Sequence, residues 1–125
     1  MNSDNFLGLF ASEKEVVTLE PGQDLFRKGD AGHHMYVVQS GELQIIDGNH
    51  VFETIPGGGL FGEMALIGKD PRSATAKAIR ETVVIPVDEK RFLFVIQQTP
   101  LFAIRVMRVM STRLRTMDER IASVS

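Results

Sequence analysis

The chain has 125 residues, 43% of them hydrophobic and 24% charged, which is typical of one ordinary globular domain. Its net charge of −2 argues against direct DNA binding, and the absence of cysteine excludes disulfides and thiolate metal sites. No apolar run approaches the roughly 18 residues that span a bilayer, and the N-terminus lacks the basic start of a signal peptide. We therefore expect a cytoplasmic protein without membrane contact.

Three regions follow one another: a lead-in over residues 1–14, a β-rich region over 15–88 and helices over 89–125. Residues 2–12 carry one apolar side, which predicts a short helix that docks on the β-rich region. From Val16 onwards the hydrophobic period changes to two, with frequent turn signals between the runs. The predicted strands are Val16–Leu19, Asp24–Arg27, His34–Gln39, Glu42–Ile46, His50–Ile55, Ser73–Ile79 and Thr82–Val87.

Short strands with glycine-rich corners predict a mainly β fold, either a sandwich or a β-roll. Asp47-Gly48 predicts a tight hairpin, and Pro56 with the three glycines after it predicts a loop. Asp88 is the expected N-cap of a helix over Glu89–Gln97. Thr99 and Pro100 then begin a last helix that runs to about Ala122.

The candidate ligand-binding residues lie in the stretch from Phe61 to Ala78, FGEMALIGKDPRSATAKA. Gly62 lets a ligand approach the backbone closely, and Glu63 places a carboxylate where a short helical turn begins. The first N–H groups of that turn are open donors that favour an anion. The planar guanidinium of Arg72 can donate two parallel hydrogen bonds to a phosphate. Ser73 and Thr75 add hydroxyl groups. The stretch suits a ligand with both phosphate and sugar hydroxyls.

This stretch resembles the phosphate-binding cassette of the cyclic-nucleotide-binding domain family, which includes catabolite-activator regulators and the regulatory subunits of cAMP-dependent protein kinase. The sequence also shares the KGD turn at 28–30 and the YVV…SGE run across 36–42 with that family. The resemblance implies an eight-stranded, jelly-roll-like β-roll with a cassette helix and C-terminal helices. It also implies a regulatory domain rather than an enzyme, with a bacterial source as the nearest type.

The resemblance assigns roles to the cassette residues. Glu63 and the Gly62 backbone would hold the ribose 2′-OH, while Arg72 would pair with the cyclic phosphate. Backbone N–H groups from Met64 to Ala65 and at Ser73, with the Ser73 hydroxyl, would help. The implied ligand is cAMP, with cGMP as the alternative, and no metal or other cofactor is expected. A salt bridge from Arg72 to Asp70 or Glu63 is the purely structural alternative.

The last helix carries a second pattern. Apolar residues at spacings of four and three form a heptad seam of Ala103, Met107, Met110, Leu114, Met117, Ile121 and Val124. We expect Ala103 and Met107 to pack on the chain's own roll. For Leu114 to Val124 we expect a homodimer instead, in which Arg113 and Asp118 could pair across the seam.

In catabolite-activator relatives a Thr-Ser pair on this helix faces the adenine. The corresponding positions here, counted from Arg113-Leu114, are Met117 and Asp118, which lack those hydroxyls. Asp118 could accept a hydrogen bond from an amino group of either purine, so these positions leave the base undecided. Met117 and Asp118 are nevertheless the predicted base contacts.

Other interpretations have less support. The run Gly57–Gly62 fits G-x-G-x-x-G, but no βαβ unit surrounds it. The histidines have no metal-ligand spacing, and no nucleophile–base pair points to an enzyme. We expect a stand-alone sensor that acts on a separate effector protein, or a piece of a longer chain. The alternative is a scaffold that ignores ligand and works by dimerising or docking a partner.

Overall fold

The computed structural model describes residues 5–10 and 12–124, and from residue 118 onwards it describes the backbone alone. Along this part of the chain the elements are η1, a 3₁₀ helix (Leu7–Leu9), β1 (Val17–Leu19), β2 (Asp24–Phe26), β3 (Met35–Ser40), β4 (Glu42–Asp47), β5 (His50–Pro56), β6 (Leu60–Phe61), α1 (Glu63–Gly68), β7 (Thr75–Ala78), β8 (Thr82–Val87), α2 (Glu89–Gln98) and α3 (Leu101–Val124).

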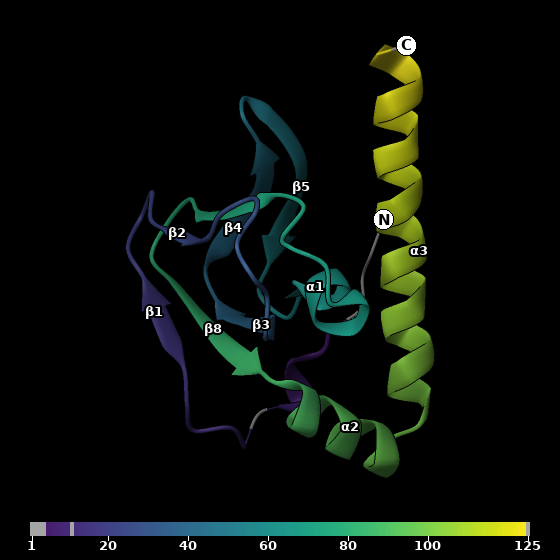
Figure 1. Cartoon of the computed structure of the whole chain (residues 1–125). Coiled ribbons are helices and arrows are strands. Elements are labelled where there is room, and N and C mark those ends of the chain that lie inside the picture. Colours follow the sequence, from purple (N-terminus) through teal and green to yellow (C-terminus); the bar gives the residue numbers. More distant parts are fainter. Residues whose placement is uncertain (1–4, 11, 125) are drawn as a thin grey trace.

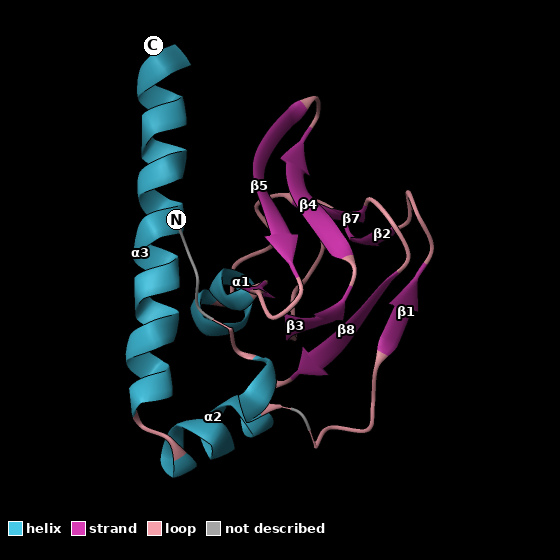
Figure 2. Ribbon diagram, turned by 180° about the vertical axis from the view of Figure 1, so that it is seen from behind, coloured by secondary structure: helices cyan, strands magenta, loops and turns pink. Residues whose placement is uncertain are grey.

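The strands form two four-stranded sheets, in the orders β1-β8-β3-β6 and β2-β7-β4-β5. Every pair in both sheets is antiparallel. Helices α2 and α3 form an L beside the sheets, and α1 lies between α3 and the sheets in both views (Figures 1 and 2). The predicted eight-stranded β-roll with flanking helices is confirmed.

The β4–β5 hairpin shows how the sequence sets the register. Asp47 faces His50 across the ladder, so only Gly48 and Asn49 form the loop. Gly48 has a φ of 60°, which glycine adopts without steric cost at the first position of a type II′ turn. Strand β6 was not predicted, because two residues are too few to show a period of two.

One cluster of buried hydrophobic side chains holds the two sheets face to face. It comprises Leu19, Val38, Leu43, Ile55, Phe61, Ala76, Ala78 and Val84, contributed by strands of both sheets. Because successive side chains of a strand point to opposite faces, this cluster uses one face of each strand and leaves the other face to the helices or the surface.

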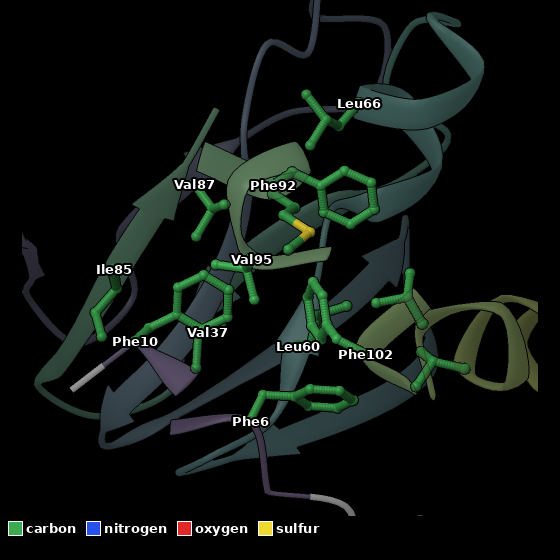
Figure 3. Packing of buried hydrophobic residues seen from close by; sticks show 13 residues of the cluster. Phe6, Phe10, Val37, Leu60, Leu66, Ile85, Val87, Phe92, Val95 and Phe102 are labelled. Atoms are coloured by element: carbon green, nitrogen blue, oxygen red, sulfur yellow. The ribbon is translucent and has the colours of Figure 1, made fainter. Parts of the chain in front are cut away.

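A second cluster joins the first sheet to the lead-in and the helices, and Figure 3 shows it. Its labelled members are Phe6, Phe10, Val37, Leu60, Leu66, Ile85, Val87, Phe92, Val95 and Phe102. The ring of Phe102 lies edge-on to those of Phe6, Phe10 and Phe92, at centroid distances of 5.7–5.9 Å. Such edge-to-face contacts favour one position of α3 beyond the burial of area alone.

The lead-in docks as expected, but the helix predicted over 2–12 is wrong for most of its described residues. Only Leu7–Leu9 are helical, as one 3₁₀ turn. The Asn5 side chain accepts a hydrogen bond from the Leu7 N–H, and the Phe6 N–H donates to the carbonyl of Gly58. Bonding to the β5–β6 loop therefore replaces the helical ladder at this point.

The two C-terminal helices begin where the caps predict. The Asp88 carboxylate accepts a hydrogen bond from the Arg91 N–H at 2.8 Å and caps α2. Helix α3 begins at Leu101, directly after Thr99-Pro100. Within the described residues no helix is long and apolar enough to cross a membrane.

Helix α3 docks on a stripe that was not the predicted one. Phe102, Val106 and Val109 are buried, at spacings of four and three, and the mostly buried Arg113 extends the stripe by four. Met107 lies beside this stripe and is 54% exposed, so the prediction that it packs on the roll is wrong. The stripe ends at a charged residue, which indicates a polar anchor rather than a continued apolar seam.

Candidate functional site

A cavity of about 190 Å³ opens between the second sheet, α1 and α3. Its floor includes Ile45 and Phe52 of the β4–β5 hairpin. One side is made by residues 62–65 and 70–74 around α1, and the covering side by residues of α3 from Arg113 to Met117. Phe26 of β2 also lines the cavity, which is therefore built by four segments of the chain.

The structure brings most of the predicted ligand-binding residues to this cavity. Gly62, Glu63, Met64, Ala65, Arg72, Ser73 and Met117 all line it, and so does Leu114, which was predicted for the dimer seam instead. Thr75 is not among the lining residues, and its hydroxyl accepts a hydrogen bond from the Lys28 N–H at 3.0 Å. The side chains of Asp118 and Ile121 lie outside the described residues.

Arg72 is a nearly buried cation, with 5% of its surface exposed. Its two terminal nitrogens donate to the carbonyls of Gly62 (3.0 Å) and His34 (2.7 Å), and the guanidinium lies 4.0 Å from the centre of the Phe26 ring. Among the described residues no carboxylate forms an ion pair with it, so neither predicted salt bridge is present. Burial accordingly lowers the pKa of Arg72, and the nearby Tyr36 and Glu63 oppose this shift.

The Nε–H of Arg72 is also buried and has no hydrogen-bond partner in the described part of the chain. A buried cation without a counter-charge is costly, because its desolvation is not repaid. The arrangement is stabilised when an anion binds in the cavity, and phosphate matches the geometry of the fork.

Gly32 supports Arg72 and was missed by the sequence analysis. A Cβ at this position would lie 2.6 Å from the Cβ of Ala65 and 2.7 Å from the Nε of Arg72. The guanidinium and α1 therefore occupy the space that a side chain would need. No signal in a single sequence separates this glycine from those that only form turns.

Gly32→Ala is expected to push Arg72 and α1 apart, because the added methyl contacts both at less than van der Waals distance. We expect a loss of about 1–3 kcal/mol in the free energy of unfolding, as for other overpacked sites. Urea unfolding measures this loss. Gly57→Ala is the matched control, since its Cβ would meet only the Gln39 carbonyl at 3.9 Å, and a variant pair of equal stability would contradict the prediction.

Glu63 is the first residue of α1 and is 1% exposed. It follows Gly62, whose φ of 82° is readily adopted by glycine and rarely by other residues. Because the N-cap of α1 is this glycine, no N-cap side chain bonds to the first turn of the helix. The Glu63 carboxylate accepts a hydrogen bond from Nη1 of Arg113 on α3 at 2.5 Å.

Arg113 joins three segments. Its Nε and Nη2 donate to the two carboxylate oxygens of Glu53 on β5, at 2.7 and 3.2 Å, and Nη2 also donates to the Leu60 carbonyl at 2.6 Å. Together with the bond to Glu63, these contacts use four of the five N–H groups of the guanidinium. Arg113 is thus the polar anchor that ends the buried stripe of α3.

Burial and the neighbouring charges act against each other on the pKa values of Glu63 and Arg113. Desolvation raises the pKa of Glu63, although the cation of Arg113 opposes that shift. The two carboxylates raise the pKa of Arg113, against the desolvation that would lower it. The sequence analysis placed Arg113 on a dimer seam; its spacing from Phe102, Val106 and Val109 was the available signal for burial.

Residues 16–99 match the family model of the cyclic nucleotide-binding domain. The chain therefore belongs to the cyclic nucleotide-binding domain family, and in that family it is a nucleotide-binding regulatory domain of the catabolite-activator and protein-kinase-A type. The β-roll is the fold that this membership implies.

Individual relatives agree with this assignment. The chain is 32% identical over 102 residues to the cyclic AMP receptor protein of Thermus thermophilus, covering 78% of this chain and 47% of that protein. It is 35% identical over 86 residues to a cGMP-dependent protein kinase of Toxoplasma gondii, covering 63% of this chain and 9% of the kinase. The chain therefore spans less than half the length of either relative.

A solved structure described as Sp-2Cl-cAMPS bound to PKAR CBD2 superposes with a TM-score of 0.75 at 26% identity. The superposition covers 84% of this chain and 70% of the other.

Proposed function

We propose that this chain senses a cyclic nucleotide, whose phosphate Arg72 binds in the cavity. The observation that carries the proposal is the burial of Arg72 without an ion pair in the described part of the chain. A cation held in this way gains a counter-charge when the phosphate binds. Ser73 and the N–H groups of Met64 and Ala65 complete the phosphate contacts.

The ribose contacts are proposed for Glu63 and the Gly62 backbone. Because Arg113 already donates to Glu63, a ribose hydroxyl must share that carboxylate with the arginine. Binding at this point therefore couples the ligand to α3. The phosphate and ribose contacts are the same for cAMP and cGMP; the resemblance places cAMP first and cGMP second, with Met117 and Asp118 as base contacts.

The proposed output is a change in the packing of α2 and α3, without catalysis. The ligand would draw α1 and Arg72 together and change the hydrogen bonding of Glu63, which α3 senses through Arg113. A ligand can shift the equilibrium between two packing states of α2 and α3 only by the difference in its affinity for those two states. The effector would be a separate protein or another part of a longer chain.

Calorimetric titration of the chain with cAMP and with cGMP tests the proposal. We expect micromolar or tighter binding of at least one of them, equivalent to about 8 kcal/mol or more. No heat and no thermal shift with either nucleotide would reject the sensor function and leave a scaffold that acts by dimerising.

We also propose a homodimer along Leu114, Met117 and Ile121 of the predicted seam. Met110, which was predicted for the same seam, is partly buried against the chain's own hydrophobic core instead. The observation that supports it is Leu114, which is 50% exposed at the middle of the long helix. A large exposed apolar side chain on a long helix can be buried by contact with a second copy of the chain.

Leu114→Lys is expected to weaken the dimer, because it places a charge in the apolar seam. Sedimentation equilibrium should show the dimer dissociation constant rising by about tenfold or more, as a loss of 1.4 kcal/mol requires. Arg115→Lys, on an exposed neighbour, is the control. A wild-type chain that remains monomeric at high concentration would contradict the proposed dimer.

A further inference from the structure

Glu53 is a carboxylate in the cavity that neither the phosphate nor the ribose contacts require. It lies on β5 opposite Ile45 of β4, and Ile45 lies opposite Ala76 of β7. Two strand spacings, about 10 Å, therefore separate Glu53 from β7, which begins two residues after Ser73. A nucleotide held by its phosphate near Ser73 reaches Glu53 with its other end, which is the base.

The Glu53 carboxylate is fixed in place but keeps free acceptor positions. Arg113 donates one hydrogen bond to each of its oxygens, which orients the group. An ionised carboxylate can accept about four hydrogen bonds and can donate none. The side chain is 34% exposed and lines the cavity, so acceptor positions remain open toward a ligand.

The other described residues at this end of the cavity give the base no comparable polar partner. Ile45, Phe52, Leu114 and Met117 present apolar surface. The hydroxyl of Thr116 donates to the Thr112 carbonyl of its own helix at 3.1 Å. Glu53 is therefore the charged acceptor that a base meets, beside the Arg113 that it holds.

We infer that Glu53 selects guanine over adenine, so that cGMP is the preferred ligand. Guanine carries two adjacent donors, N1–H and the 2-amino group, which match a carboxylate that only accepts. Adenine offers its 6-amino donor beside N1, an acceptor that a carboxylate repels. The inference rests on the proposed function, and it reverses the order of ligands that the resemblance gives.

The test compares three ligands on wild type, one variant and a control variant. Wild type and Glu53→Gln are titrated with cGMP, with cIMP, which keeps N1–H but lacks the 2-amino group, and with cAMP. Wild type should bind cGMP about tenfold or more tighter than cAMP, with cIMP between them, the discrimination expected of one bidentate contact. Glu53→Gln should remove about tenfold of affinity for cGMP and leave cAMP bound as well or better, because glutamine can pair with adenine.

Glu42→Gln is the matched control, since this glutamate is on the neighbouring strand and pairs with Arg80. It should change none of the three affinities. A wild type that prefers cAMP would overturn the inference. Equal losses of affinity for all three ligands in Glu53→Gln would also overturn it, because Glu53 would then only position Arg113. Failure of all three ligands to bind wild type would instead reject the proposed function itself, and the inference with it.

Discussion

Replacing Arg72 with leucine is expected to lower the affinity for both cyclic nucleotides by about 100-fold or more. The guanidinium would supply two charge-assisted hydrogen bonds to the phosphate, each worth about 1.5–3 kcal/mol, and 1.4 kcal/mol corresponds to tenfold. Calorimetric titration of Arg72→Leu beside wild type measures the loss. Unchanged affinity would show that the phosphate binds elsewhere.

The fold itself should tolerate this change. Leucine removes a buried cation that has no ion pair among the described residues, and this gain offsets the two carbonyls, of Gly62 and His34, that lose their donor. Circular dichroism and urea unfolding check that the variant is folded. Arg72→Lys keeps the charge but loses the planar, bidentate guanidinium, so an intermediate loss of nucleotide affinity is expected.

Replacing Arg113 with leucine should be the most destabilising change near the cavity. It leaves Glu63, at 1% exposure, as a buried carboxylate without a counter-charge, and it frees the Leu60 carbonyl. Breaking a buried ion pair from one side costs about 3–5 kcal/mol. Urea unfolding at pH 7 should show a loss of that size in the free energy of unfolding.

Removing both charges provides the control. Arg113→Leu combined with Glu63→Leu should recover most of the lost stability, because no buried charge is left unpaired. Glu53 needs no such compensation, since its partly exposed side chain can be hydrated. If the double variant were no more stable than Arg113→Leu alone, the cost would lie in packing rather than in charge.

The stability of Arg113→Leu should also depend on pH in a definite direction. Burial already raises the pKa of Glu63 above the ordinary 4.5, and removal of the cation raises it further. The folded variant then binds more protons than the unfolded chain above that pH, so its stability falls as pH rises. The deficit against wild type is expected to be smaller at pH 5 than at pH 7.

The strands and most cavity residues could be predicted from the sequence because these depend on local patterns, and the family resemblance then narrowed a sandwich or roll to the β-roll. Period-two strands, the Asp88 cap and the cassette from Phe61 to Ala78 are all contiguous in the chain. Residues such as Gly62 and Arg72 are identified by their neighbours in the sequence, and these same neighbours line the cavity. Such contiguous features can therefore be predicted from a single sequence.

The residues that were missed depend on contacts between distant segments. Arg113 meets Glu53 and Glu63 only after α3 has packed across the roll, and Gly32 matters only because Arg72 and Ala65 fill the space beside it. The heptad pattern was misleading at Met107 for the same reason. The neighbouring stripe of Phe102, Val106 and Val109 packs against the aromatic residues of the lead-in. Tertiary packing therefore decides which face of α3 is buried.

The strand pairing of the roll also shapes how the chain must fold. Val17 of β1 pairs with Val84 of β8, and Asp24 of β2 pairs with Lys77 of β7. Closing such long loops costs chain entropy before the contacts repay it, so topologies of high contact order fold slowly. During synthesis the first two strands leave the ribosome long before their partners do, and their edges stay unpaired until β7 and β8 emerge. The region between them, α1 included, is therefore synthesised before either sheet can close.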